Sequence, residues 1–190
     1  MNNKKKFLVI LVMASFLSAG TIYGFYKLTS PEIVNLVSAV ERDYPSVETL
    51  YDSSEVIARG KVIDKEVKSH TYTDDEGEER VHYYTEKQYR VQKVYKGQKI
   101  KSGETIIVRT QDAKTDKVVQ IAGANIDKNN NYVLFLKTSV FPKETGAYTF
   151  VGGPQGIFTL EAKELHHKYK GIKDLQQLEK KLTQLRNNER

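Results

Sequence analysis

The chain has 190 residues and no cysteine, and it carries 30 Lys and Arg against 24 Asp and Glu, a formal net charge of +6. This length suits one domain with a short appendage. The absence of cysteine excludes a disulfide scaffold, a thiolate zinc site, a thiol nucleophile and a lipobox-type lipid anchor. The positive charge belongs to the two ends, because residues 1–30 and 163–190 each carry +4, whereas residues 31–162 carry −2. Nucleic acid is therefore not an expected partner of the folded middle.

Residues 1–29 have the pattern of a membrane-targeting segment. The cluster Lys4-Lys5-Lys6 precedes an uncharged run of 20 residues from Phe7 to Tyr26. A helix of that length just covers a hydrocarbon core about 30 Å thick, and the lysines are expected to stay in the cytoplasm. Two alternatives stay open: an uncleaved single-span anchor, which we prefer, and a cleaved signal peptide with Ser18-Ala19-Gly20 near its cleavage site. Both place the rest of the chain outside the cytoplasm, either membrane-anchored or secreted.

Residues 30–53 are expected to form a short helical segment that packs on a sheet. Ser30, Pro31 and Glu32 suit the first turn of a helix, and apolar residues follow at helical spacing as far as Val40. The pair Tyr44-Pro45 ends this helix, and Ser46 is placed to cap a second short one.

From residue 54 the pattern changes to that of β-strands. The segment Val56–Ile63 predicts a strand that continues toward Tyr72, and Gly60 within it predicts a bend, a bulge or a close backbone approach. The acidic run Asp74–Glu79 is the expected tip of a hairpin, and Val81–Tyr95 is the returning strand.

The returning strand alternates between an apolar face and a polar face, as in a half-buried antiparallel strand. Its apolar face is expected to hold Tyr83, Thr85, Tyr89, Val91 and Tyr95. Lys87 and Lys93 interrupt this face, which predicts a bulge or a local sheet edge.

Further strands are predicted at Thr105–Arg109, Val118–Ile121, Tyr132–Leu136, Tyr148–Val151 and Ile157–Leu160. The continuous apolar segment Tyr132–Leu136 is expected to be buried on both faces. The last two strands are expected to form a pair around Gly152–Gly156. Residues 163–190 predict a basic amphipathic helix, with apolar positions at Ile172, Leu175, Leu178, Leu182 and Leu185.

These segments predict a mainly β domain, α+β overall, in which residues 54–162 form a small five- to six-stranded antiparallel barrel. The N-terminal membrane or signal helix and the C-terminal amphipathic helix flank it. A β-sandwich is the alternative architecture.

Four stretches of the middle region carry a resemblance: Ser54–Val62, Tyr89–Gly97, Tyr132–Leu136 and Gly152–Phe158. They resemble exported proteins of Bacillus-like bacteria, and their order is similar to the OB-fold barrel of the netrin and metalloproteinase-inhibitor class. The resemblance covers residues 54–160 and implies an OB-like barrel. Those inhibitors place an N-terminal cysteine on the zinc of the protease. Because this chain has no cysteine, neither that mechanism nor any functional residue is carried over.

Two segments are candidate cation sites. The spacing Asp127-x-Asn129-x-Asn131 copies the start of an EF-hand loop, but Tyr132 stands where glycine is required and Thr138 where a bidentate glutamate is required. A turn is therefore the preferred interpretation. The run Asp74–Glu79 is interpreted as a solvated tip, with weak cation binding as the alternative.

Histidines and catalytic motifs give little support for an enzyme. His70 and His82 flank the acidic tip and are able to face each other, so a zinc site with Asp74 or Glu79 is a minor alternative. The adjacent His166 and His167 point apart and chelate poorly. The sequence has no G-x-S-x-G, H-E-x-x-H or S-x-x-K motif. We therefore assign no catalytic, metal or cofactor-binding residue.

One loop is a candidate partner-contact site, formed by Gly152, Gly153, Pro154, Gln155 and Gly156. It lacks the lysine of a phosphate-binding loop, but its glycines permit the close approach of a partner. The expected function is that of a non-enzymatic cell-envelope binding module whose partner is an envelope protein or a wall polymer. The alternatives are an envelope enzyme with an unrecognised site, or a structural protein whose basic C-terminal helix contacts anionic polymer or lipid.

Overall fold

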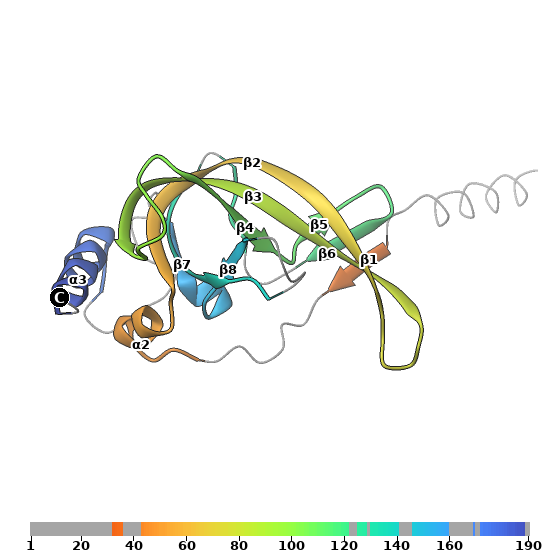
Figure 1. The fold of residues 1–190 in the computed structure, drawn as a ribbon, viewed down its shortest axis with the longest axis horizontal. Coiled ribbons are helices and arrows are strands. Elements are labelled where there is room, and N and C mark those ends of the chain that lie inside the picture. Colours follow the sequence, from red (N-terminus) through yellow and green to blue (C-terminus); the bar gives the residue numbers. More distant parts are fainter. Residues whose placement is uncertain are drawn as a thin grey trace, which may run out of the picture.

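The computed structural model describes residues 32–35, 43–121, 125–128, 130–140, 146–159, 169 and 172–188. The predicted leader at residues 1–29 and the histidine pair His166-His167 lie outside these ranges. Within the described part the fold is mainly β, with a large sheet and a C-terminal helix (Figure 1). No helix in the same ranges combines the length and the apolar composition that crossing a membrane requires.

The main sheet has the strand order β2-β3-β4-β8-β7-β9. Its strands are β2 (Val56–Thr73), β3 (Glu79–Lys96), β4 (Thr105–Thr110), β7 (Asn131–Thr138), β8 (Tyr148–Phe150) and β9 (Ile157–Thr159). β2 also pairs antiparallel with β7, and β4 pairs in parallel with β8. A smaller sheet of order β1-β6-β5 contains β1 (Glu32–Asn35), β6 (Val118–Ile121) and β5 (Ala113–Lys114). The helices are α2 (Val47–Asp52) and α3 (Leu175–Asn188), and a 3-10 turn covers Gly153–Gly156.

β2 and β3 form a long twisted hairpin, each strand having 18 residues (Figure 1). Gly60 makes the predicted close approach, because a Cβ atom there would lie 2.2 Å from the carbonyl oxygen of Arg90. The register shifts at this point, leaving Gln92 without a partner on β2, and the predicted bulge in β3 is therefore confirmed.

The bulge changes which face the end of β3 presents. Tyr89 and Val91 belong to one core cluster, whereas Tyr95 belongs to the other. The prediction that Tyr95 shares a face with Tyr89 and Val91 is wrong, because the extra residue at Gln92 reverses the alternation of the strand.

Two apolar clusters lie on opposite faces of β7. Tyr132, Leu134 and Leu136 belong to one cluster with Val62, Tyr89 and Val108. Val133 and Phe135 belong to the other, which α2 and α3 cover with Leu50, Tyr51, Leu178 and Leu182. The prediction that Tyr132–Leu136 is buried on both faces is therefore confirmed.

The first predicted helix is wrong where the structure describes it. Residues Glu32–Asn35 form β1, which pairs in parallel with β6, so that Glu32 lies opposite Val118. β-branched residues such as Ile33 and Val34 suit a strand, and pairing with β6 overrides the local helical spacing. The second predicted helix is confirmed as α2. Ser46 caps it, with its Oγ atom accepting a hydrogen bond from the N–H of Thr49 at 3.2 Å.

The last two strands are arranged differently from the prediction. β8 and β9 do not pair with each other, and both pair with β7, at Leu136–Thr138 and Tyr132–Leu134 respectively. The 3-10 turn between them places the two short strands one after the other along the longer β7. The C-terminal helix α3 begins at Leu175, after Asp174 accepts the N–H of Gln177, and most of the predicted helix before residue 172 lies outside the described residues.

Candidate functional site

The β2–β3 hairpin reaches well beyond the rest of the main sheet. β7 pairs with β2 only over Val56–Lys61, and β4 pairs with β3 only over Thr85–Arg90. Residues 63–84 therefore form a two-stranded extension, here called the arm, which leaves the body of the molecule in Figure 1. Three of the four large apolar side chains that are exposed in the described part lie on the arm: Val67, Tyr72 and Val81.

A pocket of about 520 Å³ lies where the arm meets the β5–β6 segment, and we call it the arm pocket. Val67, Ala113 and Val119 supply apolar lining, and Lys65, Lys114, Asp112 and Asp116 supply charge. The two lysines balance the two aspartates, so the charged lining has no net charge. Gln120 also lines the pocket and fixes the β6 side, because its Nε2 atom donates to the carbonyl of Tyr83 at 2.8 Å. The pocket combines apolar contacts with charges of both signs.

Lys87 lies fully buried near this pocket, with only 1% of its side chain exposed. Its ammonium group donates to the Asp112 carboxylate at 3.2 and 3.3 Å, to the Ile126 carbonyl at 3.0 Å and to the amide oxygen of Asn125. Burial lowers the pKa of Lys87, and the charge of Asp112 opposes part of that effect. Lys87 pairs with Lys65 on β2 and with Val108 on β4, so the sheet edge that was one of the two predicted alternatives is wrong for this residue. Lys87 joins the two ends of the chain segment that contains β5 and β6.

The opposite face of the hairpin carries a second charge network. The carboxylate of Glu86 accepts hydrogen bonds from Arg109 at 2.6 and 2.9 Å, and its other oxygen lies 2.7 Å from the ammonium of Lys68. Burial alone would raise the pKa of Glu86, but Lys68 and Arg109 outweigh this effect and hold the pKa below its ordinary value. Arg109 also stacks over the Tyr84 ring, 5.1 Å from its centre. This network stiffens the base of the arm.

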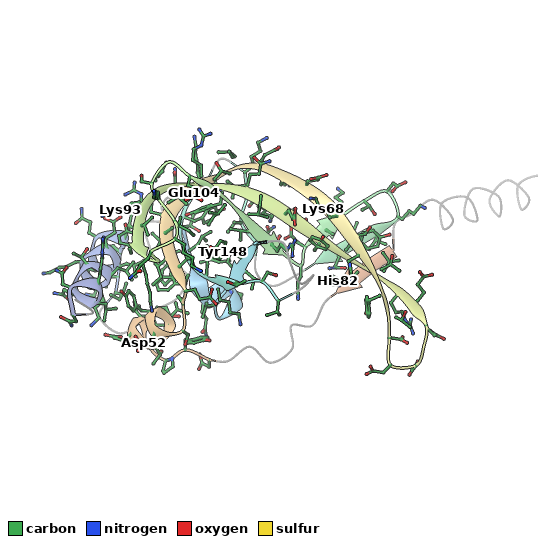
Figure 2. The ribbon with its side chains drawn as sticks, in the orientation of Figure 1. Asp52, Lys68, His82, Lys93, Glu104 and Tyr148 are labelled. Carbon is green, nitrogen blue, oxygen red and sulfur yellow. The ribbon has the colours of Figure 1, made fainter. Side chains whose placement is uncertain are left out.

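The tip of the arm resembles the predicted solvated turn. Asp74 accepts hydrogen bonds from the N–H groups of Glu76 and Glu78 and from the Arg80 side chain. Asp74, Glu76 and Glu78 are close enough to share a cation, but such exposed acidic groups are common without one. His70 and His82 are opposite each other in the β2–β3 register, as predicted. Burial, followed by the charge of His70, lowers the pKa of His82. Figure 2 shows His82 on the arm, away from α2 and α3.

The predicted partner-contact loop, Gly152–Gly156, is partly covered by the chain itself. A Cβ atom at Gly152 would lie 2.7 Å from the Tyr44 ring, so the close approach that glycine permits is made by Tyr44. Gln155 accepts the N–H of Tyr44 at 3.0 Å and donates to Asp43 at 2.7 Å. The hydroxyl of Tyr169 lies 3.5 Å from the Gln155 carbonyl. Contact of this loop with an external partner stays a prediction.

The residues of the arm pocket did not stand out in the sequence. Asp112, Lys114 and Asp116 belong to a segment without a motif, and the structure brings them next to Lys65 and Val67 through the β4–β5 connection. Lys87 did give a signal, because a lysine in phase with buried Tyr89 and Val91 requires buried acceptors. Comparison of the chain with protein-family models finds no match, and comparison with curated proteins finds none either.

Proposed function

We propose that the chain is a non-enzymatic binding module of the cell envelope, anchored to the membrane or exported through residues 1–29. The support for this location is the leader pattern of Lys4-Lys5-Lys6 and the apolar run that follows it. The described residues begin beyond this leader.

We also propose that the strands form an OB-like barrel, as the resemblance of residues 54–160 implies. Hydrogen-bonded pairs run from β2 through β3, β4, β8 and β7 and return to β2, which supports closure. The apolar cluster that contains Val62, Tyr89, Val108 and Leu134 would then fill the interior. The OB-fold is a small five-stranded barrel that commonly serves as a binding scaffold.

The arm pocket is the observation that carries the binding role. Its lining of Val67, Ala113 and Val119 offers apolar contact to a ligand, and its two lysines and two aspartates offer charges of both signs. A polyanionic wall polymer would meet no net positive charge here. An extended segment of a protein carries apolar and oppositely charged side chains together, and it is therefore the favoured ligand.

Site-specific photo-crosslinking in intact cells tests this role. A photoreactive residue at exposed Lys114 of the pocket should capture a defined envelope protein, whereas one at exposed Asp52 on α2 should not. The substitution Lys65→Glu gives the pocket a net negative charge and should reduce capture several-fold. Identical adducts from positions 114 and 52, or capture unaffected by Lys65→Glu, would refute the binding role.

The location has its own test. Cell fractionation followed by mass spectrometry of the N-terminus should find a membrane species that retains Met1 if the leader is an anchor. A chain in the medium that begins near Thr21 would establish a cleaved signal instead. A species found only in the cytoplasm would contradict export in either form.

Two alternatives are less well supported by the contacts in the described part. An enzyme would need titratable groups in a concave site, and the arm pocket does contain Asp112 and Asp116. However, the Asp112 carboxylate is held by Lys87, whose ammonium group is itself fully engaged. A lipid-bound C-terminal helix would need a free apolar face, and α3 buries Leu178 and Leu182 against the body.

A further inference from the structure

One edge of β2 is covered along only part of its length. β7 pairs with Val56–Lys61, and Lys128 forms a bridge with Val62. Among the described residues, no strand pairs with this edge from Ile63 to Thr73, where β2 is joined to β3 alone. An unpaired edge of this length presents its backbone N–H and C=O groups as a template for another strand.

Charged side chains at a sheet edge normally discourage such pairing. On β2, however, their order allows a symmetric pair of strands in which opposite charges face each other. In a symmetric antiparallel pair of two identical strands, the residue at the centre fixes which residues lie opposite each other. If Val67 is the centre, Glu66 of each copy lies opposite Lys68 of the other, and the two Val67 side chains meet. If Glu66 or Lys68 is the centre, two glutamates or two lysines face each other at the axis. Opposite charges on facing residues stabilise a pair of strands, and like charges destabilise it.

The same register brings a second set of complementary charges together. Thr71 of one copy then lies opposite Ile63 of the other, the last position before β7 and Lys128 cover the edge, and the acidic tip Asp74–Glu79 begins just beyond it. Lys61 is exposed, and Lys128 beside it has 49% of its side chain exposed. The acidic tip of each arm would therefore lie close to two lysines of the other copy. Lys128 already forms an ion pair with Asp64 at 3.4 Å, which shows that this lysine points along the β2 edge.

We propose that two copies of this chain associate through the free edges of their β2 strands, in an antiparallel pair centred on Val67. The two hairpins then form one continuous sheet in the order β3-β2-β2-β3. Val67, which is 37% exposed in the single chain, becomes covered. This association goes beyond the proposed binding function, and because Val67 also lines the arm pocket, a second copy and a ligand of the pocket would compete for this residue.

The absence of cysteine makes cross-linking a direct test. Val67→Cys in the full chain, purified in detergent, places two thiols opposite each other across the proposed two-fold axis. Facing residues in antiparallel strands have Cα atoms about 4.5–5.5 Å apart, which suits a disulfide. Val81→Cys is the control, because Val81 lies on the same arm and is 51% exposed but belongs to β3. Under mild oxidation, the Val67→Cys chain should form a dimer about tenfold faster or more than the control.

Charge reversal tests the register itself. In the Val67→Cys background, Glu66→Lys alone or Lys68→Glu alone puts like charges opposite each other and should slow cross-linking about tenfold. A mixture of these two variants restores opposite charges and should recover the rate, giving mixed dimers of distinguishable mass. Lys68→Glu also removes the ion pair with Glu86, so circular dichroism must confirm that each variant folds.

Two results would overturn the proposal. One is a Val67→Cys chain that cross-links no faster than Val81→Cys, a comparison that holds even where a charge variant fails to fold. The other is a mixture of folded charge variants that cross-links no faster than each variant alone.

Discussion

Lys87 has an environment that is unusual for a lysine, because its side chain is only 1% exposed. Lysine is rarely buried fully unless its charge is paired and hydrogen-bonded. Here Asp112, Asn125 and Ile126 supply acceptors from both sides of the segment that contains β5 and β6. The ammonium group therefore fixes where that segment leaves and rejoins the main sheet, and with it the shape of the arm pocket.

Substitution Lys87→Met should destabilise the protein by about 3 kcal/mol, because it keeps the aliphatic chain but leaves three acceptors without their donor. Urea unfolding followed by circular dichroism measures the loss. Lys61→Met, at an exposed position of β2, is the matched control and should change the free energy of unfolding by less than about 0.5 kcal/mol. Equal effects of the two substitutions would show that the hydrogen bonds of the Lys87 ammonium group contribute nothing to stability.

Buried tyrosines predict a loss of stability at alkaline pH. Burial raises the pKa of Tyr89 well above 10.0 and that of Tyr169 to about 12. Their contribution to stability is fully present below pH 10.0, the ordinary pKa of tyrosine. It is lost as the pH rises through the raised pKa values of the folded state. Lys87 acts in the opposite direction, because its lowered pKa makes the fold more stable as the pH approaches 10.5.

The contribution of Tyr89 to this alkaline pH dependence can be isolated by mutation. Tyr89→Phe removes hydrogen bonds to the carbonyls of Ala58 and Tyr132 and should lower the stability at pH 8. It should also reduce the further loss between pH 10 and 12, measured by urea unfolding at each pH. A variant that loses as much stability over this range as the parent chain would contradict the role of Tyr89.

At the scale of elements, the sharp curvature of β2 and β3 depends on Gly60. Any larger residue there would place its Cβ atom 2.2 Å from the Arg90 carbonyl oxygen, so that the two strands would have to separate.

Helix α3 is held to the same strands by Glu179, which accepts a hydrogen bond from Tyr95 and forms ion pairs with Arg59 at 3.3 Å and Lys93 at 3.6 Å.

Gly60→Ala should destabilise the fold by about 3 kcal/mol, the upper range for overpacking in a core. Gly77→Ala is its control. Gly77 also has a constrained backbone, with φ of +83°, but a Cβ atom there meets open space, so a loss of about 1 kcal/mol is expected. Thermal unfolding of the two variants distinguishes a steric requirement at the hairpin from a general preference for glycine.

Glu179→Gln should loosen α3 selectively. Burial alone would raise the pKa of Glu179, but Tyr95, Lys93 and Arg59 outweigh it and lower the pKa below 4.5. The carboxylate therefore stabilises α3 above pH 4.5, and this contribution is lost as the pH falls through the lowered value. Hydrogen exchange at pH 7 should be faster in residues 175–188 of Glu179→Gln, whereas exposed Gln184→Ala should leave it unchanged. Faster exchange throughout the main sheet would instead indicate global destabilisation.

At the scale of the whole molecule, the net charge of +6 does not describe one surface. The basic residues at the N-terminus belong to the predicted leader, and the middle of the chain is slightly acidic. In the C-terminal helix, Lys181 forms an ion pair with Glu48 on α2, so part of the remaining positive charge holds the helix to the body. The arm projects from the opposite end of the molecule from α3 (Figure 1). This separation leaves the arm accessible while the helices cover the core.

The sequence alone determined the local features whose cause is local. Segments rich in strand-forming residues placed the strands β2, β3, β4, β6 and β7, a continuous apolar run marked β7 as buried on both faces, and Ser46 marked the start of α2. Only the tertiary structure decided the features that depend on distant partners. The residues Glu32–Asn35 became a strand because β6 offers them a parallel partner, and β8 and β9 both pair with the longer β7. Lys87 could be buried because Asp112 and Ile126, 25 and 39 residues away, supply its acceptors. Spacing along the chain reports which face a residue occupies where the strand has no bulge, but it does not report which remote backbone will meet that face.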